Sequence, residues 1–251
     1  KYEKNSLFLY ICSNFPNSVI FIFTLTLCLG IYGATKLEVE NSFVDYFKKD
    51  TEIYKGMKLI DDKLGGTTPL DIIIEFNVDK ENLFEKDESD DFLDFGIEYD
   101  PADYWFTKEK IDTIKRVHDH LEMYPFAGKV LSLASIVRTA EKLNSDREFD
   151  TLELSVLYKN LPKDLKEQII SPYVLIDKDQ ARISMRLIDT HSELKRSEFI
   201  NDLNKYIENN FSTEAINISL AGILILYNNM LESLFDSQIK SLAIVLSGIF
   251  I

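Results

Sequence analysis

The sequence predicts an α+β domain made of two split βαβ subdomains of the ferredoxin-like kind, flanked by transmembrane helices. Three observations predict this organisation. Apolar runs lie near both ends of the 251-residue chain, at 15–36 and 238–251. The stretch between them is highly charged and mixes helical with strand periodicity. Two strand–helix–strand patterns stand in that stretch, one at 37–76 and the other at 182–220.

The first apolar run is long enough to cross a membrane. Residues 19–34 are all apolar or small, and the wider run 15–36 reaches the roughly 20 residues that span about 30 Å of hydrocarbon. A cleaved signal peptide is the alternative, but bulky Tyr32 stands where cleavage requires a small residue. We therefore expect a retained helix that follows a short cytoplasmic or interfacial N-terminus, 1–14.

The second run, 238–251, is too short to cross by itself, because a helix rises about 1.5 Å per residue. We expect it to be the start of a second transmembrane helix in a longer chain. A buried C-terminal core helix is the alternative. Helical periodicity at 222–235 predicts that the helix begins at Gly222 and runs into this segment without a break.

Charge predicts the topology. The formal net charge is −14, and 41 of the 42 Asp and Glu residues lie in 37–237. This charge argues against a nucleic-acid partner, because phosphate binding needs a basic patch. A long loop between two spans is placed outside the cytoplasm, with basic flanks inside. We expect the domain at 37–237 to lie outside the cytoplasm and the N-terminus to face the cytoplasm.

Periodicity places the elements of this domain in order. The first helix follows an N-cap at Asp50 or Thr51, carries an apolar stripe and stops at Gly65-Gly66. The stripe, expected to be buried, consists of Ile53, Met57, Ile60 and Leu64. Further helices are expected at 107–124, 134–143, 152–161, from 162, and at 192–211. Strands are expected at 37–41, 70–76, 130–133, 173–176, 182–188 and 216–220.

An acidic block at 79–103 interrupts the domain. It holds 11 acidic residues against Lys80 and Lys86, a composition typical of a solvated insertion. A calcium site is the alternative, although the block lacks the glycine and the ligand spacing of an EF-hand loop.

No catalytic, cofactor-binding or metal site is predicted. His118 and His120 stand two apart on an expected helix and point to different faces, and His191 stands alone. The Gly65-Gly66-Thr67-Thr68 sequence follows a helix and is not followed by Lys, so it predicts a helix end rather than a phosphate loop. The sequence therefore does not predict an enzyme.

Several short motifs, taken in order, resemble one family. They follow the first apolar run, surround the first strand and precede the second apolar run, and they are SFVDYF at 42–47, DTEIY at 50–54, LGGTTP at 64–69, LAG at 220–222 and SQIKSL at 237–242. The set is similar to the resistance-nodulation-division (RND) superfamily of permeases, and within it to the MMPL-type branch of lipid and hopanoid exporters, which is related to Patched-like proteins. Ala221 departs from the small hydroxyl residue that many relatives carry before the glycine.

The resemblance implies that 37–237 is a periplasmic or extracellular porter domain of a multi-pass protein in the cytoplasmic (inner) membrane. It implies export of hydrophobic or amphipathic molecules such as lipids, driven by the proton-motive force. It also implies a second half of the same polypeptide as partner, besides the bilayer and the substrate. Oligomers and accessory proteins stay open, as does the class of an extracytoplasmic sensor domain in a two-helix receptor.

Five residues are candidates for substrate entry and for coupling to the membrane. They are Phe43, Phe47, Gly222, Leu226 and Met230. Gly222 stands where a strand turns into a helix, which suits a hinge or a close-packing point. The other four are apolar residues expected at the membrane surface. The alternative is that they only pack the domain against its partner half.

Overall fold

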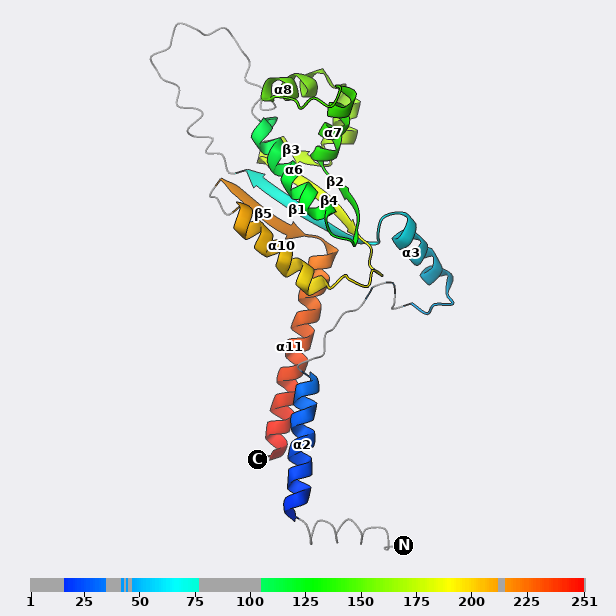
Figure 1. Ribbon diagram of the computed structural model, residues 1–251, viewed down its shortest axis with the longest axis vertical. Coiled ribbons are helices and arrows are strands. Elements are labelled where there is room, and N and C mark those ends of the chain that lie inside the picture. The colour runs from blue at the N-terminus through cyan, green and yellow to red at the C-terminus, as the bar shows by residue number, and fades with distance from the viewer. Residues whose placement is uncertain are drawn as a thin grey trace, which may run out of the picture. The chain divides into compact units, whose positions relative to one another are not determined.

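The computed structural model describes residues 16–34, 42, 44, 47–76, 105–211 and 215–250 (Figure 1). The chain divides into two units, Lys1–Glu40 and Asn41–Ile251. The first holds helix α2 (Pro16–Ala34), and the second holds the sheet and every other element that the structure describes. The predicted strand 37–41, the acidic block 79–103, the N-terminus 1–14 and Phe43 lie outside the described residues.

One antiparallel sheet forms the centre of the second unit, so the chain has an α+β fold. Its strands run in the order β2-β4-β1-β5, and the short β3 pairs with β4. Their bounds are Thr68–Phe76 for β1, Ala127–Leu131 for β2, Val174–Leu175 for β3, Gln180–Leu187 for β4 and Ile216–Ala221 for β5. All strands predicted within the described residues are therefore present, with ends that shift by up to three residues.

The strands belong to a single interleaved motif rather than to two subdomains. Helix α6 (Lys108–Glu122) joins β1 to β2, and helix α10 (Arg196–Phe211) joins β4 to β5. Strand β4 lies between β1 and β2, while β1 lies between β4 and β5. The expected unit at 182–220 is confirmed. The expectation of two subdomains is wrong for the described residues, because both neighbours of β1 come from the distant second half of the chain.

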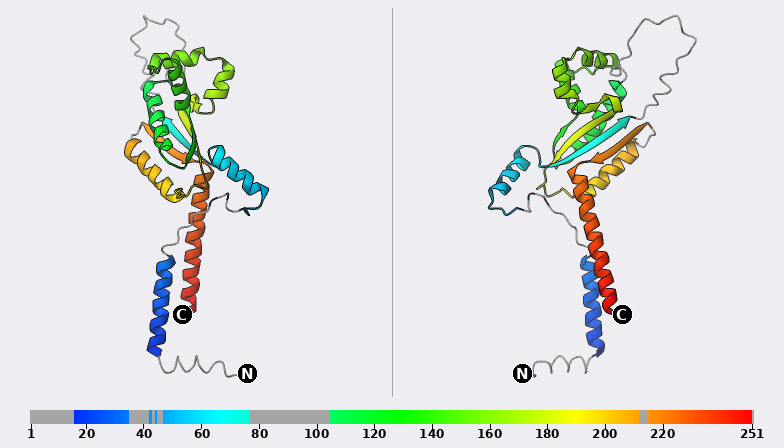
Figure 2. Two further views of the ribbon diagram at one scale, coloured as in Figure 1. Left: turned by 45° about the vertical axis from the view of Figure 1, so that its right-hand side comes forward. Right: turned by 180° about the vertical axis from the view of Figure 1, so that it is seen from behind.

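Helices α6 and α10 cover one face of the sheet, and the view from behind shows the other face without helices (Figure 2). The covered face buries alternate residues of β1, which are Leu70, Ile72, Ile74 and Phe76. They pack against Ile111, Ile114 and Val117 of α6 and Phe199, Leu203 and Ile207 of α10. The apolar run Leu70–Phe76 thus contributes every second side chain to the core, and Ile73 turns to the other face.

Polar side chains bridge the strands on the uncovered face. Arg182 donates to Asp71 at 2.8 Å, while Gln180 and Asn217 donate to the two oxygens of Glu75 at 2.6 and 3.0 Å. These contacts cross from β1 to β4 and from β1 to β5. The uncovered face is therefore polar, as expected for an antiparallel sheet with one solvated side.

A helical insertion connects β2 to β4. It contains α7 (Leu133–Leu143), α8 (Thr151–Asn160), α9 (Lys163–Leu165), a π-helical turn at Lys166–Ile170 and a 3-10 turn at Ile176–Lys178. Asp150 and Glu153 form a capping box at the start of α8. Lys110 of α6 and Asp179 form a buried ion pair of 2.5 Å that fastens the end of the insertion.

Helix α3 (Glu52–Lys63) corrects one expectation. Its N-cap is Thr51, as predicted, and Gly66 after it has a φ of +95°. A Cβ on Gly66 would lie 2.2 Å from the carbonyl oxygen of Leu187, so only glycine fits there. The apolar stripe is not buried, because Ile53 and Leu64 remain 58% and 61% exposed. The helix attaches to the sheet through a polar residue, Asp61, instead.

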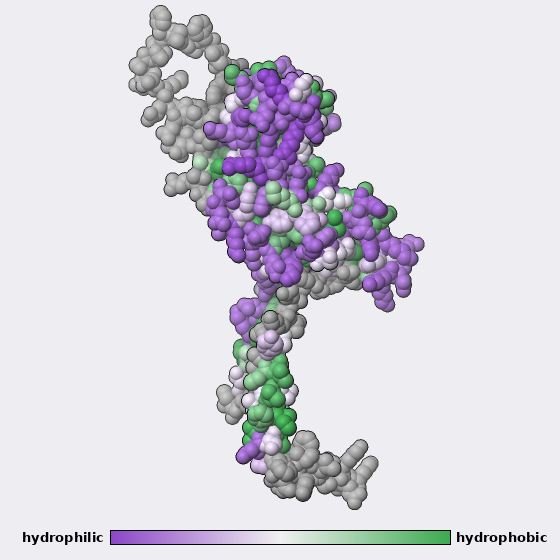
Figure 3. Space-filling model, in the orientation of Figure 1, coloured by the Kyte–Doolittle hydropathy of each residue, from purple (hydrophilic) through white to green (hydrophobic). Residues whose placement is uncertain are grey.

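Helix α11 (Ile223–Phe250) leaves the end of β5 as one unbroken helix, which confirms the predicted continuity of 222–235 with 238–251. Its C-terminal part is hydrophobic, whereas the surface of the domain in the same view is mostly hydrophilic (Figure 3). Lys240 and Asp236 form an ion pair of 2.7 Å on this helix. Within the part of the chain that the structure describes, no helix is both long and apolar enough to cross a membrane, so the spans expected at 15–36 and 238–251 are not supported.

Candidate functional site

A cavity of about 290 Å³ lies where β1 begins and α11 leaves the sheet. Three segments form it: the start of β1, the loop from β4 together with the first residue of α10, and the first two turns of α11. Its lining residues are Thr67, Thr68, Pro69, Asp189, Arg196, Ile223, Leu224, Leu226, Tyr227 and Met230. We call it the α11 pocket.

The wall of the α11 pocket is apolar. Ile223, Leu226, Tyr227 and Met230 recur at helical spacing and therefore share one face of α11. Leu226 is 70% exposed and Met230 is 48% exposed, so both are accessible to a ligand. Leu224 on the same helix is buried in the core and holds α11 against the sheet.

Gly222 fixes the angle at which α11 leaves the sheet. Its φ of +112° is one that side chains with a Cβ rarely adopt. A Cβ there would also lie 3.3 Å from the carbonyl oxygen of Pro69 and 3.4 Å from the backbone nitrogen of Asp71. Gly222 therefore allows close packing of the β5–α11 junction against β1.

The floor of the α11 pocket is a buried ion pair. Asp189 Oδ1 accepts from the guanidinium of Arg196 and, at 2.8 Å, from the hydroxyl of Thr68. Asp189 Oδ2 accepts from the hydroxyl of Ser42 at 2.7 Å and from the backbone N–H of Val44 at 3.3 Å. Both charged side chains are almost fully buried. The pair thus ties β1, α10 and the segment before α3 together.

The surroundings of Asp189 keep it ionised. Burial by itself raises the pKa of this carboxyl, but hydrogen bonds from Ser42, Arg196 and Thr68 and the positive charge of Arg196 outweigh burial. The net effect is a pKa below its usual range. The floor therefore carries one negative and one positive charge at neutral pH, and the two compensate each other.

A second buried carboxylate, that of Asp61 in α3, accepts hydrogen bonds from residues that form this floor. Its Oδ1 accepts from the backbone N–H of Thr67, the hydroxyl of Thr67 and the backbone N–H of Asp189, at 2.7 to 2.9 Å. Its Oδ2 accepts from the N–H and the hydroxyl of Thr190 at 2.9 and 2.8 Å. Five hydrogen bonds to a side chain with no exposed surface make α3 a fixed part of the domain.

The structure brings some of the predicted site residues together. Leu226 and Met230 line the α11 pocket, and Gly222 forms the junction beside it. Phe47 is half-buried and is not among the lining residues. Phe43 lies outside the described residues, so its expected place stays untested.

Sequence reasoning missed the polar floor. Asp61, Asp189 and Arg196 had no distinguishing signal in a chain with 42 acidic residues, where carboxylates are common at every spacing. The one available signal was position, because Asp189 directly follows a strand and Arg196 begins a helix. Residues at the ends of strands and helices can meet at one edge of a sheet. Only the pairing of the strands shows which of these ends lie together.

The two helical histidines have separate partners, as their spacing predicted. His118 Nδ1 lies 2.9 Å from the hydroxyl of Ser132, and its Nε2 lies 3.2 Å from Glu122. Burial lowers the pKa of His118. His120 instead stacks on Tyr206 of α10, with ring centroids 3.4 Å apart.

The serine, histidine and glutamate are the residue types of a hydrolase triad, but the serine faces Nδ1 instead of Nε2. Ser132 and His118 are also buried and line no described pocket. Ser132 also caps α7 by accepting from the backbone N–H of Ala134. The chain of hydrogen bonds therefore joins α6 to α7. No group of three or more histidine, cysteine or acidic side chains suited to a metal ion occurs in the described ranges.

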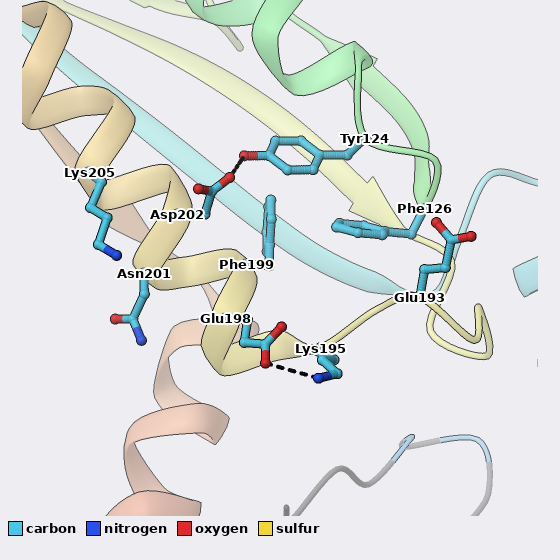
Figure 4. A pocket seen from close by; sticks show the side chains of 9 residues that line it. All are labelled: Tyr124, Phe126, Glu193, Lys195, Glu198, Phe199, Asn201, Asp202 and Lys205. Carbon is cyan, nitrogen blue, oxygen red and sulfur yellow. Dashed lines mark hydrogen bonds and ion pairs between the residues drawn. The ribbon is translucent and has the colours of Figure 1, made fainter.

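A second hollow, of about 430 Å³, lies between the end of α6 and the first turns of α10 (Figure 4). Phe126 and Phe199 meet edge to face at its floor, with centroids 5.1 Å apart. Tyr124 donates to Asp202 at 2.8 Å, and Lys195 pairs with Glu198 at 2.9 Å. These polar and charged side chains line the hollow, so it offers less apolar wall than the α11 pocket.

Comparison with known proteins adds no assignment: no family model matches the chain, and no curated protein matches it significantly in sequence.

Proposed function

We propose that the chain is the porter-domain portion of a membrane exporter of the RND/MMPL kind, which moves hydrophobic or amphipathic molecules such as lipids. The observation that carries the proposal is the α11 pocket. It has an apolar wall, and that wall belongs to the same helix that continues into a hydrophobic segment. The resemblance of the motifs at 42–54, 64–69 and 220–242 supports the same class.

The exposed apolar residues of the two helices support a place at a lipid bilayer. In α11 these include Ile239, Leu242, Ile244, Val245 and Ile249, each more than half exposed. In α2 they include Ile20, Phe21, Phe23 and Leu29. Contiguous apolar surface of this kind is unfavourable in water and is normally covered by lipid or protein. We propose lipid as its main environment, with the acidic domain on the extracytoplasmic side.

In this proposal α11 couples the pocket to the membrane. The helix is continuous from Ile223 to Phe250, and Gly222 and Leu224 hold its first turn against the sheet. A movement of the sheet is therefore carried along the helix axis into its hydrophobic part. The chemistry needs no catalytic group, because the energy would come from a proton gradient acting elsewhere in the full-length protein. The second half of the same polypeptide would complete the transport path.

The second candidate is an extracytoplasmic sensor. The same continuity of α11 favours it, because a ligand in the pocket could move a helix that leads to a signalling domain. The two classes differ in whether the ligand itself crosses the membrane.

A transport assay tests the proposal. Cells that produce the full-length protein are loaded with the lipophilic dye N-phenyl-1-naphthylamine, and dye retention is measured with and without an uncoupler. We expect lower retention that the uncoupler reverses, and loss of this effect in Leu226→Trp, which fills the pocket. Leu143→Trp, at an exposed leucine of α7, is the control and should behave as wild type. Equal retention with and without the protein would refute export of this probe class.

A further inference from the structure

The polar groups on the floor of the α11 pocket are already engaged by the protein. The hydroxyl of Thr67 donates to Asp61 at 2.7 Å, and that of Thr68 donates to Asp189 at 2.8 Å. Both oxygens of Asp189 accept hydrogen bonds, and the guanidinium of Arg196 binds Oδ1 and, at 3.3 Å, the backbone carbonyl oxygen of Asp189. A charged ligand would therefore compete with bonds that the protein already makes.

The floor is also electrically balanced. Asp189 and Arg196 lie side by side, and each is at most 7% exposed. A carboxylate entering the pocket would meet Asp189 as well as Arg196, and an ammonium group would meet Arg196 as well as Asp189. Neither sign of charge therefore recovers the hydration that it loses on burial.

The size of the pocket limits what it holds. Its volume is about 290 Å³. A water molecule takes up about 30 Å³ in the liquid, so this volume corresponds to roughly ten non-hydrogen atoms of ligand. That is one aliphatic segment and not a whole two-chain lipid.

From these observations we infer that the α11 pocket binds an uncharged aliphatic segment of about ten non-hydrogen atoms, and that Asp189 and Arg196 determine this specificity by cancelling each other's charge. A charged end group of the same molecule stays outside the pocket. The inference rests on the proposed function for its biological meaning, but binding itself does not require export.

A local reporter separates binding in the pocket from partitioning into lipid. The chain has four methionines, and Met230 lines the pocket whereas Met123 is exposed at the end of α6. The full chain, labelled with ¹³C at the methionine methyl groups and reconstituted in nanodiscs, is titrated with decan-1-ol, decanoate or decylammonium. We expect decanol to shift the Met230 signal saturably and to leave Met123 unchanged. The two ions should bind about tenfold more weakly or worse.

Two charge variants sharpen the test. Arg196→Gln leaves the Asp189 carboxylate uncompensated, so decylammonium should become the best ligand. Asp189→Asn leaves the guanidinium uncompensated, so decanoate should become the best ligand. Leu226→Trp should abolish the Met230 response to all three. If either variant does not fold, the comparison of the three ligands on the wild-type protein tests the inference by itself.

The inference is overturned if an ion binds wild-type protein as well as decanol does. It is also overturned if Met230 responds to none of the three, which would mean that polypeptide fills the pocket. Binding of decanol without dye export would refute the proposed exporter and support the binding inference. Dye export without binding would support the exporter and overturn the inference.

Discussion

The carboxylate of Asp61 accepts the backbone N–H of Asp189 at 2.9 Å, although the two residues are 128 positions apart in the chain. This bond joins helix α3 to the loop that carries the floor of the α11 pocket. The two buried carboxylates thus form one network with Thr67, Thr68 and Arg196. The network holds the edge of the sheet from which α11 leaves.

Removal of the Asp61 carboxylate should destabilise the domain strongly. Asp61→Ala leaves several buried donors without an acceptor, and we expect a loss on the order of 3 kcal/mol in the free energy of unfolding. Urea denaturation followed by circular dichroism measures it. Asp62→Ala, at the exposed neighbouring position, is the control and should change the stability by no more than about 0.5 kcal/mol. Equal effects would show that the network contributes little.

Asp189 should make stability depend on pH in the acidic range. Its pKa is lowered in the folded protein, so the unfolded chain binds the proton more tightly. The stabilisation is fully present above the unfolded pKa of about 3.9 and is lost as the pH falls through the lower folded value. Asp189→Asn should therefore be less stable than wild type at pH 7, and the difference should shrink below about pH 4. A difference in unfolding free energy between wild type and Asp189→Asn that stays constant from pH 3 to pH 7 would contradict this prediction.

The two apolar stripes should differ in their tolerance of truncation. Ile72→Ala removes a fully buried side chain of β1 and should cost about 2–4 kcal/mol. Ile53→Ala, on the exposed stripe of α3, should cost no more than about 0.5 kcal/mol. Thermal unfolding of both variants checks the pair. A large loss for Ile53→Ala would mean that α3 is covered in solution.

Replacing glycine by alanine should destabilise the protein at Gly222 and stabilise it at Gly56. Gly222→Ala forces a Cβ into a backbone conformation with φ +112° beside Pro69, and we expect a loss of about 1–3 kcal/mol. Gly56 lies inside α3 with open space around it, so Gly56→Ala should stabilise the protein by about 0.5–1 kcal/mol. Melting temperatures of the two variants test both signs. A neutral Gly222→Ala would show that the junction is loose.

The sequence by itself determined the types of the elements. Helical and alternating periods follow from local backbone geometry, so α6, α8, α10 and the strands β1, β4 and β5 were predicted close to their observed bounds. The same applies to the end of α3 at Gly65-Gly66 and to the continuity of α11, because each depends on neighbouring residues only. Leu226 and Met230 were predicted as candidates from the apolar character of their helix, and both line the α11 pocket.

Tertiary structure alone decided how those elements combine. The placement of β1 between β4 and β5 made one sheet where two subdomains were expected, since pairing partners come from distant parts of the chain. The pairing places Ile72 and Ile74 on the covered face of the sheet and Ile73 on the other face. Periodicity in a continuous apolar run cannot predict which of these residues are buried. The pairing also left the stripe of α3 uncovered and gathered Asp61, Asp189 and Arg196 at one sheet edge. A buried charge network depends on three-dimensional proximity, and no local pattern in an acidic sequence encodes it.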